Sequence, residues 1–138
     1  MLRISRRTDY AVRIIIAAAQ EPPGVMVPAA QIGEQMAIPP SFLFKVIGDL
    51  KRGGLLLTAT GRHGGIRLTR PADKITLLEV VEAVEGPVLL NSIHLPAQGR
   101  APDEHCPHPV WSHIQQVLEA EMSAVSIADM ACSGYEPC

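Results

Sequence analysis

The sequence predicts a mainly α-helical fold with a small β-hairpin. Three observations support this prediction: apolar residues recur at helical spacing before Arg52, two short strand candidates follow around a glycine-rich link, and a long amphipathic helix lies near the end. The chain has 138 residues, of which 47% are hydrophobic and 19% charged, a composition typical of a folded domain. This order of elements is that of a winged helix-turn-helix followed by a long dimerisation helix.

Two helices are expected in the first part of the chain. The first covers residues 6–20, where apolar side chains recur at helical spacing and either Ser5 or Thr8 can cap the start. A very short strand over residues 25–27 comes next. The second helix begins at Pro28, because the first turn of a helix accommodates proline.

The third helix is expected from Phe42 to about Arg52, with Ser41 as its N-cap. Its apolar face comprises Leu43, Val46, Ile47 and Leu50. Two strand candidates, residues 55–59 and 66–69, follow and are joined by a link that contains three glycines. In such a module the second helix of the pair enters the major groove, and the hairpin reaches the backbone or the minor groove nearby.

The second half of the chain is expected to carry a capped helix, a long loop and a long helix. Thr76 caps the helix over residues 75–84, and Glu79 stands three residues later. The polar, proline-rich segment over residues 88–109 is the natural place for a sensor. The last long helix covers about residues 110–124, and a further helical turn is expected over residues 126–130. Its apolar stripe comprises Val110, Ile114, Val117, Leu118 and Met122, with Trp111 beside it.

The charge of the chain is divided unevenly. Residues 1–74 contain 11 Lys and Arg against 5 Asp and Glu, a net charge of +6, whereas residues 75–138 contain 1 against 9, a net charge of −8. A split of this kind indicates a nucleic-acid surface on the basic side. We therefore expect a DNA-binding domain over residues 1–74, and a linker helix, sensor loop, dimerisation helix and tail over residues 75–138.

The apolar stripe of the last helix is expected to be buried against another protein surface. A second copy of the chain in a two-fold homodimer is the simplest one. The alternative is that this helix folds back on the first helix of the same chain.

Other protein classes lack support in the sequence. No apolar run approaches the roughly 20 residues that cross a bilayer, and no export signal is recognisable, so a cytoplasmic protein without a membrane partner is expected. The sequence contains no phosphate-binding glycine loop, nucleophile elbow or paired-histidine metalloprotease motif, so we do not expect an enzyme. The alternative class is a winged-helix adaptor that binds proteins and not DNA. Three cysteines, an odd number, do not suggest a disulfide framework.

Five blocks of the sequence carry a resemblance to a known family. They are Ser5-Arg6-Arg7-Thr8-Asp9-Tyr10-Ala11, Ile38-Pro39-Pro40-Ser41-Phe42-Leu43, Leu50-Lys51-Arg52-Gly53-Gly54-Leu55, Gly61-Arg62-His63-Gly64-Gly65-Ile66-Arg67-Leu68, and the segment from Ile75 to Gly86. Together they resemble the bacterial regulator family that includes the iron-sulfur cluster regulator IscR, the nitric-oxide-sensing repressor NsrR and the cysteine-metabolism regulator CymR. The resemblance implies a homodimeric transcription factor that binds double-stranded, palindromic DNA and often holds an iron-sulfur cluster in the loop before the dimerisation helix.

This resemblance assigns candidate DNA-binding residues. Ser41, Phe42 and Lys45 would face the major groove, and Arg62 and His63 at the tip of the wing would reach a narrow groove. Arg3, Arg6 and Arg7 would hold the backbone near the start of the first helix. Cluster-bearing relatives commonly carry an acidic residue at the position of Phe44 and an arginine at that of Thr60, so a different DNA sequence is expected here.

The resemblance also assigns candidate ligands for the sensor, which are Asp9 from the partner subunit, His94, His105, Cys106 and His108. Two of the family's three loop cysteines are absent, so a cluster or another metal would need mixed ligands. Two alternatives stay open. Cys106 can be a redox thiol that pairs with Cys132 or with a cysteine of the partner subunit, or the sensory function is lost or uses a small molecule.

Overall fold

In the part of the chain that the structure describes, three α-helices and a hairpin come first, and a short 3-10 helix and three further α-helices follow. The structure is a computed structural model, described here for residues 4–88 and 108–132. The helices are α1 (Arg6–Ala19), α2 (Ala29–Gln35), α3 (Pro40–Arg52), α4 (Leu77–Glu85), α5 (His108–Ala124) and α6 (Ile127–Cys132). The strands are β1 (Leu56–Ala59) and β2 (Gly65–Leu68), and a short 3-10 helix, η1, spans Ala72–Lys74.

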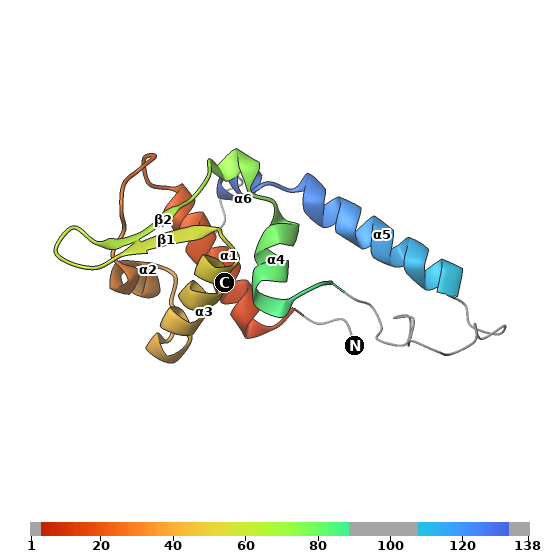
Figure 1. Cartoon of the computed structure of the whole chain (residues 1–138), viewed down its shortest axis with the longest axis horizontal. Helices are drawn as coiled ribbons and strands as arrows, with labels where there is room; N and C mark the ends of the chain where they lie inside the picture. Colours follow the sequence, from red (N-terminus) through yellow and green to blue (C-terminus); the bar gives the residue numbers. More distant parts are fainter. Residues whose placement is uncertain (1–3, 89–107, 133–138) are drawn as a thin grey trace.

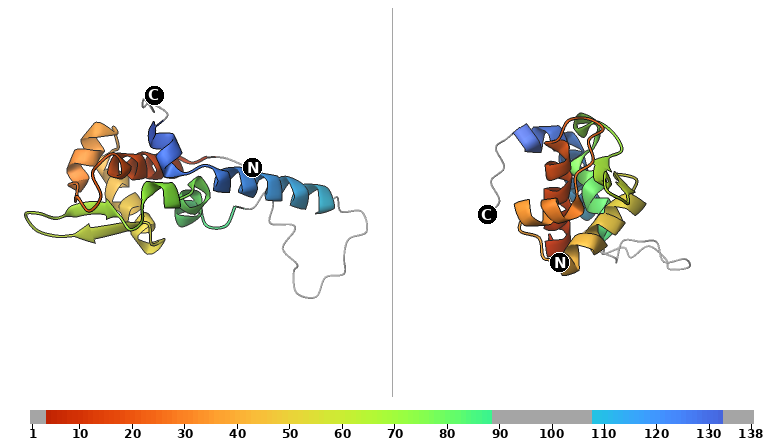
Figure 2. Two further views of the ribbon diagram at one scale, coloured as in Figure 1. Left: turned by 90° about the horizontal axis from the view of Figure 1, so that it is seen from above. Right: turned by 90° about the vertical axis from the view of Figure 1, so that its left-hand side faces the viewer.

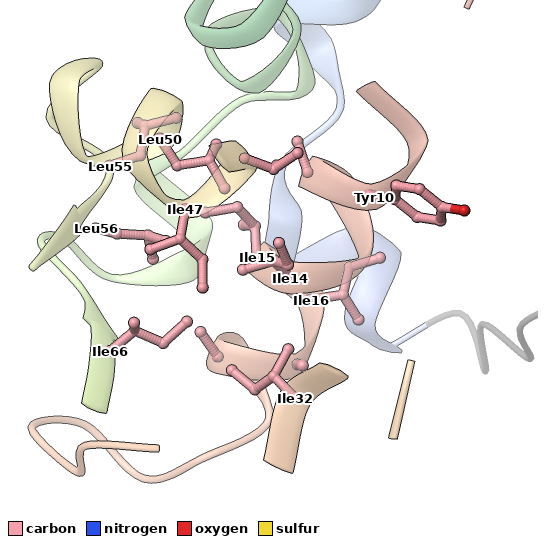
Figure 3. Packing of buried hydrophobic residues seen from close by; sticks show 14 of the residues in the cluster. Tyr10, Ile14, Ile15, Ile16, Ile32, Ile47, Leu50, Leu55, Leu56 and Ile66 are labelled. Carbon is pink, nitrogen blue, oxygen red and sulfur yellow. The ribbon is translucent and has the colours of Figure 1, made fainter. Parts of the chain in front are cut away.

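Helix α1 lies at the centre of the core. Ser5 is its N-cap and accepts a hydrogen bond from the backbone N–H of Thr8 at 3.2 Å. Three consecutive residues, Ile14, Ile15 and Ile16, are fully buried, although a surface helix buries only one face. They are buried because α3, α4, α6 and β2 all pack against α1 (Figure 3).

The turn between α2 and α3 corrects one expectation. Pro39, and not Ser41, is the N-cap of α3, and Pro40 occupies the first turn. Proline fits there because its fixed φ suits a helix and the missing N–H would have no helical partner. Ser41 therefore lies within the first turn of α3, and its side chain is free to face outward.

The hairpin is antiparallel, with Leu56 paired with Leu68 and Ala59 with Gly65. The expected strand over residues 25–27 is reduced to a single bridge, in which the backbones of Val27 and Ile66 exchange hydrogen bonds of 2.9 and 2.8 Å. Gly65 has a φ of +140°, and a Cβ at this position would overlap the carbonyl of Val27. This glycine therefore allows the hairpin to join the body of the domain.

Helix α4 confirms the predicted cap. The Thr76 hydroxyl accepts from the backbone N–H of Glu79 at 3.3 Å, and the Glu79 carboxylate accepts from the backbone N–H of Thr76 at 2.9 Å. Ile75, Val80 and Ile127, which lie beyond the expected boundary at residue 74, are fully buried in the same core as α1.

Helix α5 extends away from this body and contacts α4 (Figures 1 and 2). Three residues of its apolar stripe are exposed, Val110 at 59%, Ile114 at 42% and Val117 at 48%, whereas Leu118 and Met122 are half-buried, and no close packing of α5 against α1 is found among the described residues. The alternative in which this stripe folds back on α1 is therefore wrong. Within residues 4–88 and 108–132, no helix is both long and apolar enough to span a membrane.

Candidate nucleic-acid interface

Helix α3 has a buried face and a polar, cationic face. Leu43, Val46, Ile47 and Leu50 are buried, as predicted. At 100° per residue, Ser41, Lys45, Gly48 and Arg52 lie on the opposite side of the helix. Ser41, Lys45 and Arg52 are exposed there. A face with this composition can donate hydrogen bonds to phosphates and base edges.

The two phenylalanines of α3 point in different directions. Phe42, which is expected from the sequence to face the groove, is half-buried, and its ring meets that of Tyr10 edge-on at a centroid distance of 5.3 Å and an angle of 61°. Phe44 instead is 65% exposed on the outer side of the helix. The signal that could have found it is the helical wheel, since Phe44 lies away from the buried positions Val46 and Leu50.

The wing places two further candidates at its tip. Arg62 and His63 lie between β1 and β2 and are both exposed. The hairpin and α3 lie at the same end of the molecule, away from α5 (Figure 1). The structure thus brings the candidates of α3 and those of the wing to one end of the domain.

The start of α1 divides its arginines between solvent and the protein. Arg6 is exposed, whereas Arg7 donates to the Asp49 carboxylate of α3 at 2.8 Å. Asp49 has a side chain only 6% exposed, and it also pairs with Arg52. Arg7 thus links the start of α1 to α3, and its side chain has less freedom than that of Arg6 to contact a ligand. Arg3 lies outside the described residues.

A second polar contact joins the start of α1 to the end of α4. Ser5 and Thr8 donate from their hydroxyls to the Glu85 carboxylate, the latter at 2.7 Å. The hydrogen bonds from Ser5 and Thr8 lower the pKa of Glu85 below its ordinary value. The ionised form of Glu85 is therefore the one that holds these two helices together.

The remaining cations separate into paired and unpaired sets. Arg7 and Arg52 pair with Asp49, Arg13 with Asp9 and Arg70 with Glu79. Among the described residues, no carboxylate lies within ion-pair range of Arg6, Lys45, Lys51, Arg62, Arg67 or Lys74. Four of these six lie on α3 or on the wing. The unpaired positive charge is therefore concentrated at the candidate interface.

The candidate metal ligands are not brought together in the described part of the chain. The Asp9 carboxylate accepts from Arg13 at 2.7 Å, and Arg13 also donates to the carbonyl of Met36 at 3.1 Å. His94, His105 and Cys106 lie outside the described residues, and His108 begins α5 with a side chain that is not described. Residues 4–88 and 108–132 contain no group of three or more potential ligands. The exposed thiol of Cys132 lies on α6.

Two relatives are similar to this chain in sequence. The "Protein aau3" of Rhizobium meliloti (strain 1021) is 40% identical over 85 residues, which cover 61% of this chain and 54% of that protein. The match thus spans about half the length of that relative. The "Putative HTH-type transcriptional regulator Rv1287" of Mycobacterium tuberculosis is 26% identical over 131 residues, covering 94% of this chain and 81% of that protein.

Solved structures share the fold at low identity. The structure of CymR, described as the Global Cysteine Regulator of B. subtilis, superposes with a TM-score of 0.79 at 20% identity and covers 98% of this chain and 100% of that one. The structure of T. potens IscR gives 0.78 at 22% identity, covering 97% and 89%. These likenesses confirm the winged helix-turn-helix fold.

The family assignment rests on nearly the whole chain. The family Rrf2, described as "Iron-dependent Transcriptional regulator", matches residues 4–133, which include all the elements described above. Members of this family are regulators of transcription and not enzymes. The chain therefore belongs to the Rrf2 family of transcriptional regulators.

Proposed function

We propose that this chain is a homodimeric regulator that binds palindromic double-stranded DNA through α3 and the wing, with α5 as the dimer interface. In this proposal, residues 1–74 bind DNA, and residues 75–138 contain the linker helix, the sensor loop, the dimerisation helix and the tail. The observation that carries the DNA-binding part is the location of the unpaired cations Lys45, Lys51 and Arg62 on α3 and at the tip of the wing. Phosphates are the partner that such a surface fits best.

The salt dependence of binding tests this proposal. The slope of log K against log salt on duplex DNA grows by about 0.9 for each neutralised phosphate. We expect Lys45→Ala and Arg62→Ala each to reduce that slope by about 1. Lys74→Ala is the matched control, because Lys74 is an unpaired, exposed lysine on η1 and not on α3 or the wing. An adaptor without DNA binding would show no steep salt dependence in the wild-type protein.

The dimer proposal rests on the exposed stripe of α5. Val110, Trp111, Ile114 and Val117 are between 42% and 59% exposed and lie within two turns of one helix. A contiguous apolar surface of this kind on a soluble protein marks an interaction site. A second α5 offers a surface of the same shape and chemistry, as a two-fold interface requires. The DNA site for such a dimer would contain two half-sites whose centres lie about one turn of the double helix apart.

Modulation of DNA binding is proposed to act through residues 88–109. This segment joins α4 to α5, so it lies between the proposed DNA-binding and dimerisation parts. The described residues do not by themselves fit an iron-sulfur cluster or another metal, since Asp9 is engaged by Arg13 and they contain no group of three or more potential ligands. The cluster proposal therefore depends on His94, His105, Cys106 and His108.

Three measurements distinguish the hypotheses for the sensor. Protein prepared without oxygen and assayed for visible absorption, iron and sulfide tests the cluster. If a cluster is present, Cys106→Ala should remove the response of DNA binding to iron, nitric oxide or oxidant without altering the fold. A response of the wild-type protein to oxidant alone favours the thiol switch. Cys132→Ala separates the Cys106–Cys132 pair from a pair formed between subunits. An unchanged response in both variants would contradict the cluster and the thiol switch together.

A further inference from the structure

Phe44 is exposed where its neighbours are polar. Its side chain is 65% exposed, although burial of a phenylalanine is strongly favourable, and no ring contact is found for it among the described residues. On the same side of α3 lie Ser41, Lys45 and Gly48, at the spacings −3, +1 and +4. The exposed aromatic ring therefore lies within the face that we propose contacts DNA.

Gly48 lies at the centre of this face and has no reason within the chain to be glycine. A Cβ built there would meet only the Nη1 atom of Arg52, at 3.8 Å, which is an ordinary van der Waals contact. The other helix-associated glycines differ: a Cβ at Gly33 would lie 2.9 Å from Leu43 and one at Gly53 would lie 2.7 Å from Ala83. Glycine is unfavourable inside a helix, so its presence at position 48 suggests a close approach from outside the chain.

The charge of the surrounding residues identifies the class of partner. Lys45 and Lys51 flank Phe44 and Gly48 and have no carboxylate within ion-pair range in the described structure. An acidic surface would satisfy these lysines but offers nothing to the ring of Phe44. The major groove of DNA provides both, because phosphates line its edges and the C5-methyl group of thymine projects from its floor.

We propose that Phe44 is a specificity-determining residue that packs against thymine C5-methyl groups, and that Gly48 lets the backbone of α3 approach the bases beside it. This inference rests on the proposed DNA-binding function. The ring of Phe44 cannot hydrogen-bond to a base edge, so the methyl group is the one feature of the groove floor that it can recognise by apolar contact. The preferred half-site is therefore expected to contain thymine opposite Phe44.

The test replaces thymine by uracil, which lacks only this methyl group. A duplex enriched by the wild-type protein from a random pool is resynthesised with uracil at each thymine in turn, and its affinity is measured at one salt concentration. We expect the wild-type protein to lose about fourfold in affinity for each contacted methyl group. Phe44→Ala should bind the thymine and uracil duplexes equally, and Phe44→Leu should keep part of the preference.

Controls separate this inference from the proposed function. Val25→Ala truncates another exposed apolar side chain, in the loop after α1, and should leave the preference for thymine unchanged. If the wild-type protein binds no duplex, the proposed function fails. If it binds DNA but does not distinguish thymine from uracil, or if Phe44→Ala distinguishes them as the wild type does, the inference about Phe44 is wrong and the proposed function stands. A change of oligomeric state in Phe44→Ala, with the thymine preference intact, would likewise overturn it.

Discussion

Substituting Gly48 by alanine should make the fold more stable and DNA binding weaker. Alanine is favoured over glycine in a helix interior by about 0.5–1 kcal/mol. The added Cβ would lie 3.8 Å from the guanidinium of Arg52, so no clash opposes this gain. For a chain of this size the midpoint of thermal unfolding should rise by about 2–5 °C. The same methyl group would stand between the α3 backbone and the bases, and overpacking there should reduce DNA affinity at least about fivefold.

Gly53→Ala is the control, because it should have the opposite effect on the stability of the fold. A Cβ at Gly53 would lie 2.7 Å from that of Ala83 on α4, so Gly53→Ala should lower the stability of the fold. Stability is measured by thermal unfolding followed by circular dichroism, and affinity by fluorescence anisotropy of a labelled duplex. If Gly48→Ala destabilises the protein, the reasoning about its surroundings is wrong. If it stabilises the protein and leaves DNA affinity unchanged, the proposed close approach of α3 to the bases is wrong.

Three further predictions concern the cap of α4, the contact between α1 and α4, and the dimer. Thr76→Ala removes the N-cap of α4 and should lower the free energy of unfolding by about 1 kcal/mol, as measured by denaturation, whereas an unchanged value would contradict the capping box. Hydrogen bonds from Ser5 and Thr8 lower the folded-state pKa of Glu85, so its contribution is complete above the ordinary value of 4.5 and is lost as the pH falls through the folded pKa. In Glu85→Gln the free energy of unfolding should therefore fall less steeply toward acidic pH than in the wild-type protein, as measured by unfolding curves at a series of pH values. Identical pH profiles of the two proteins would count against the contact. Val117→Lys places a charge in the exposed stripe of α5 and should give monomers in sedimentation experiments with an intact circular dichroism spectrum; a variant that stays dimeric would exclude this stripe as the interface.

Local patterns in the sequence predict much of the fold. The period of apolar residues identifies α1, α3 and α4, and the Thr76–Glu79 spacing locates the start of α4 within one residue. The start of α3 is less predictable, because Pro39, Pro40 and Ser41 are all acceptable near a helix N-terminus. The structure places the cap at Pro39, two residues before the expected one.

The candidate interface is less predictable from the sequence than the fold, because long-range contacts determine which side chains are free. Nothing near Asp49 in the sequence indicates that its carboxylate is buried and held by Arg7, which lies 42 positions earlier. The outward direction of Phe44 follows from helix geometry alone. The inward direction of Phe42 depends on the ring of Tyr10 in another helix, which a local pattern does not reveal.

Net charge alone would misplace the cationic surface of this protein. Residues 1–74 carry a charge of +6, yet four of their arginines are held by carboxylates of the same chain. The arginines of these pairs have limited freedom to meet phosphates, and an exposed pair contributes little field at a distance. The lysines and arginines without such partners lie mainly on α3 and the wing. The location of ion-pair partners, and not the sum of charges, therefore determines where unpaired positive charge remains, and it remains mainly on α3 and the wing, the surface that we propose contacts DNA.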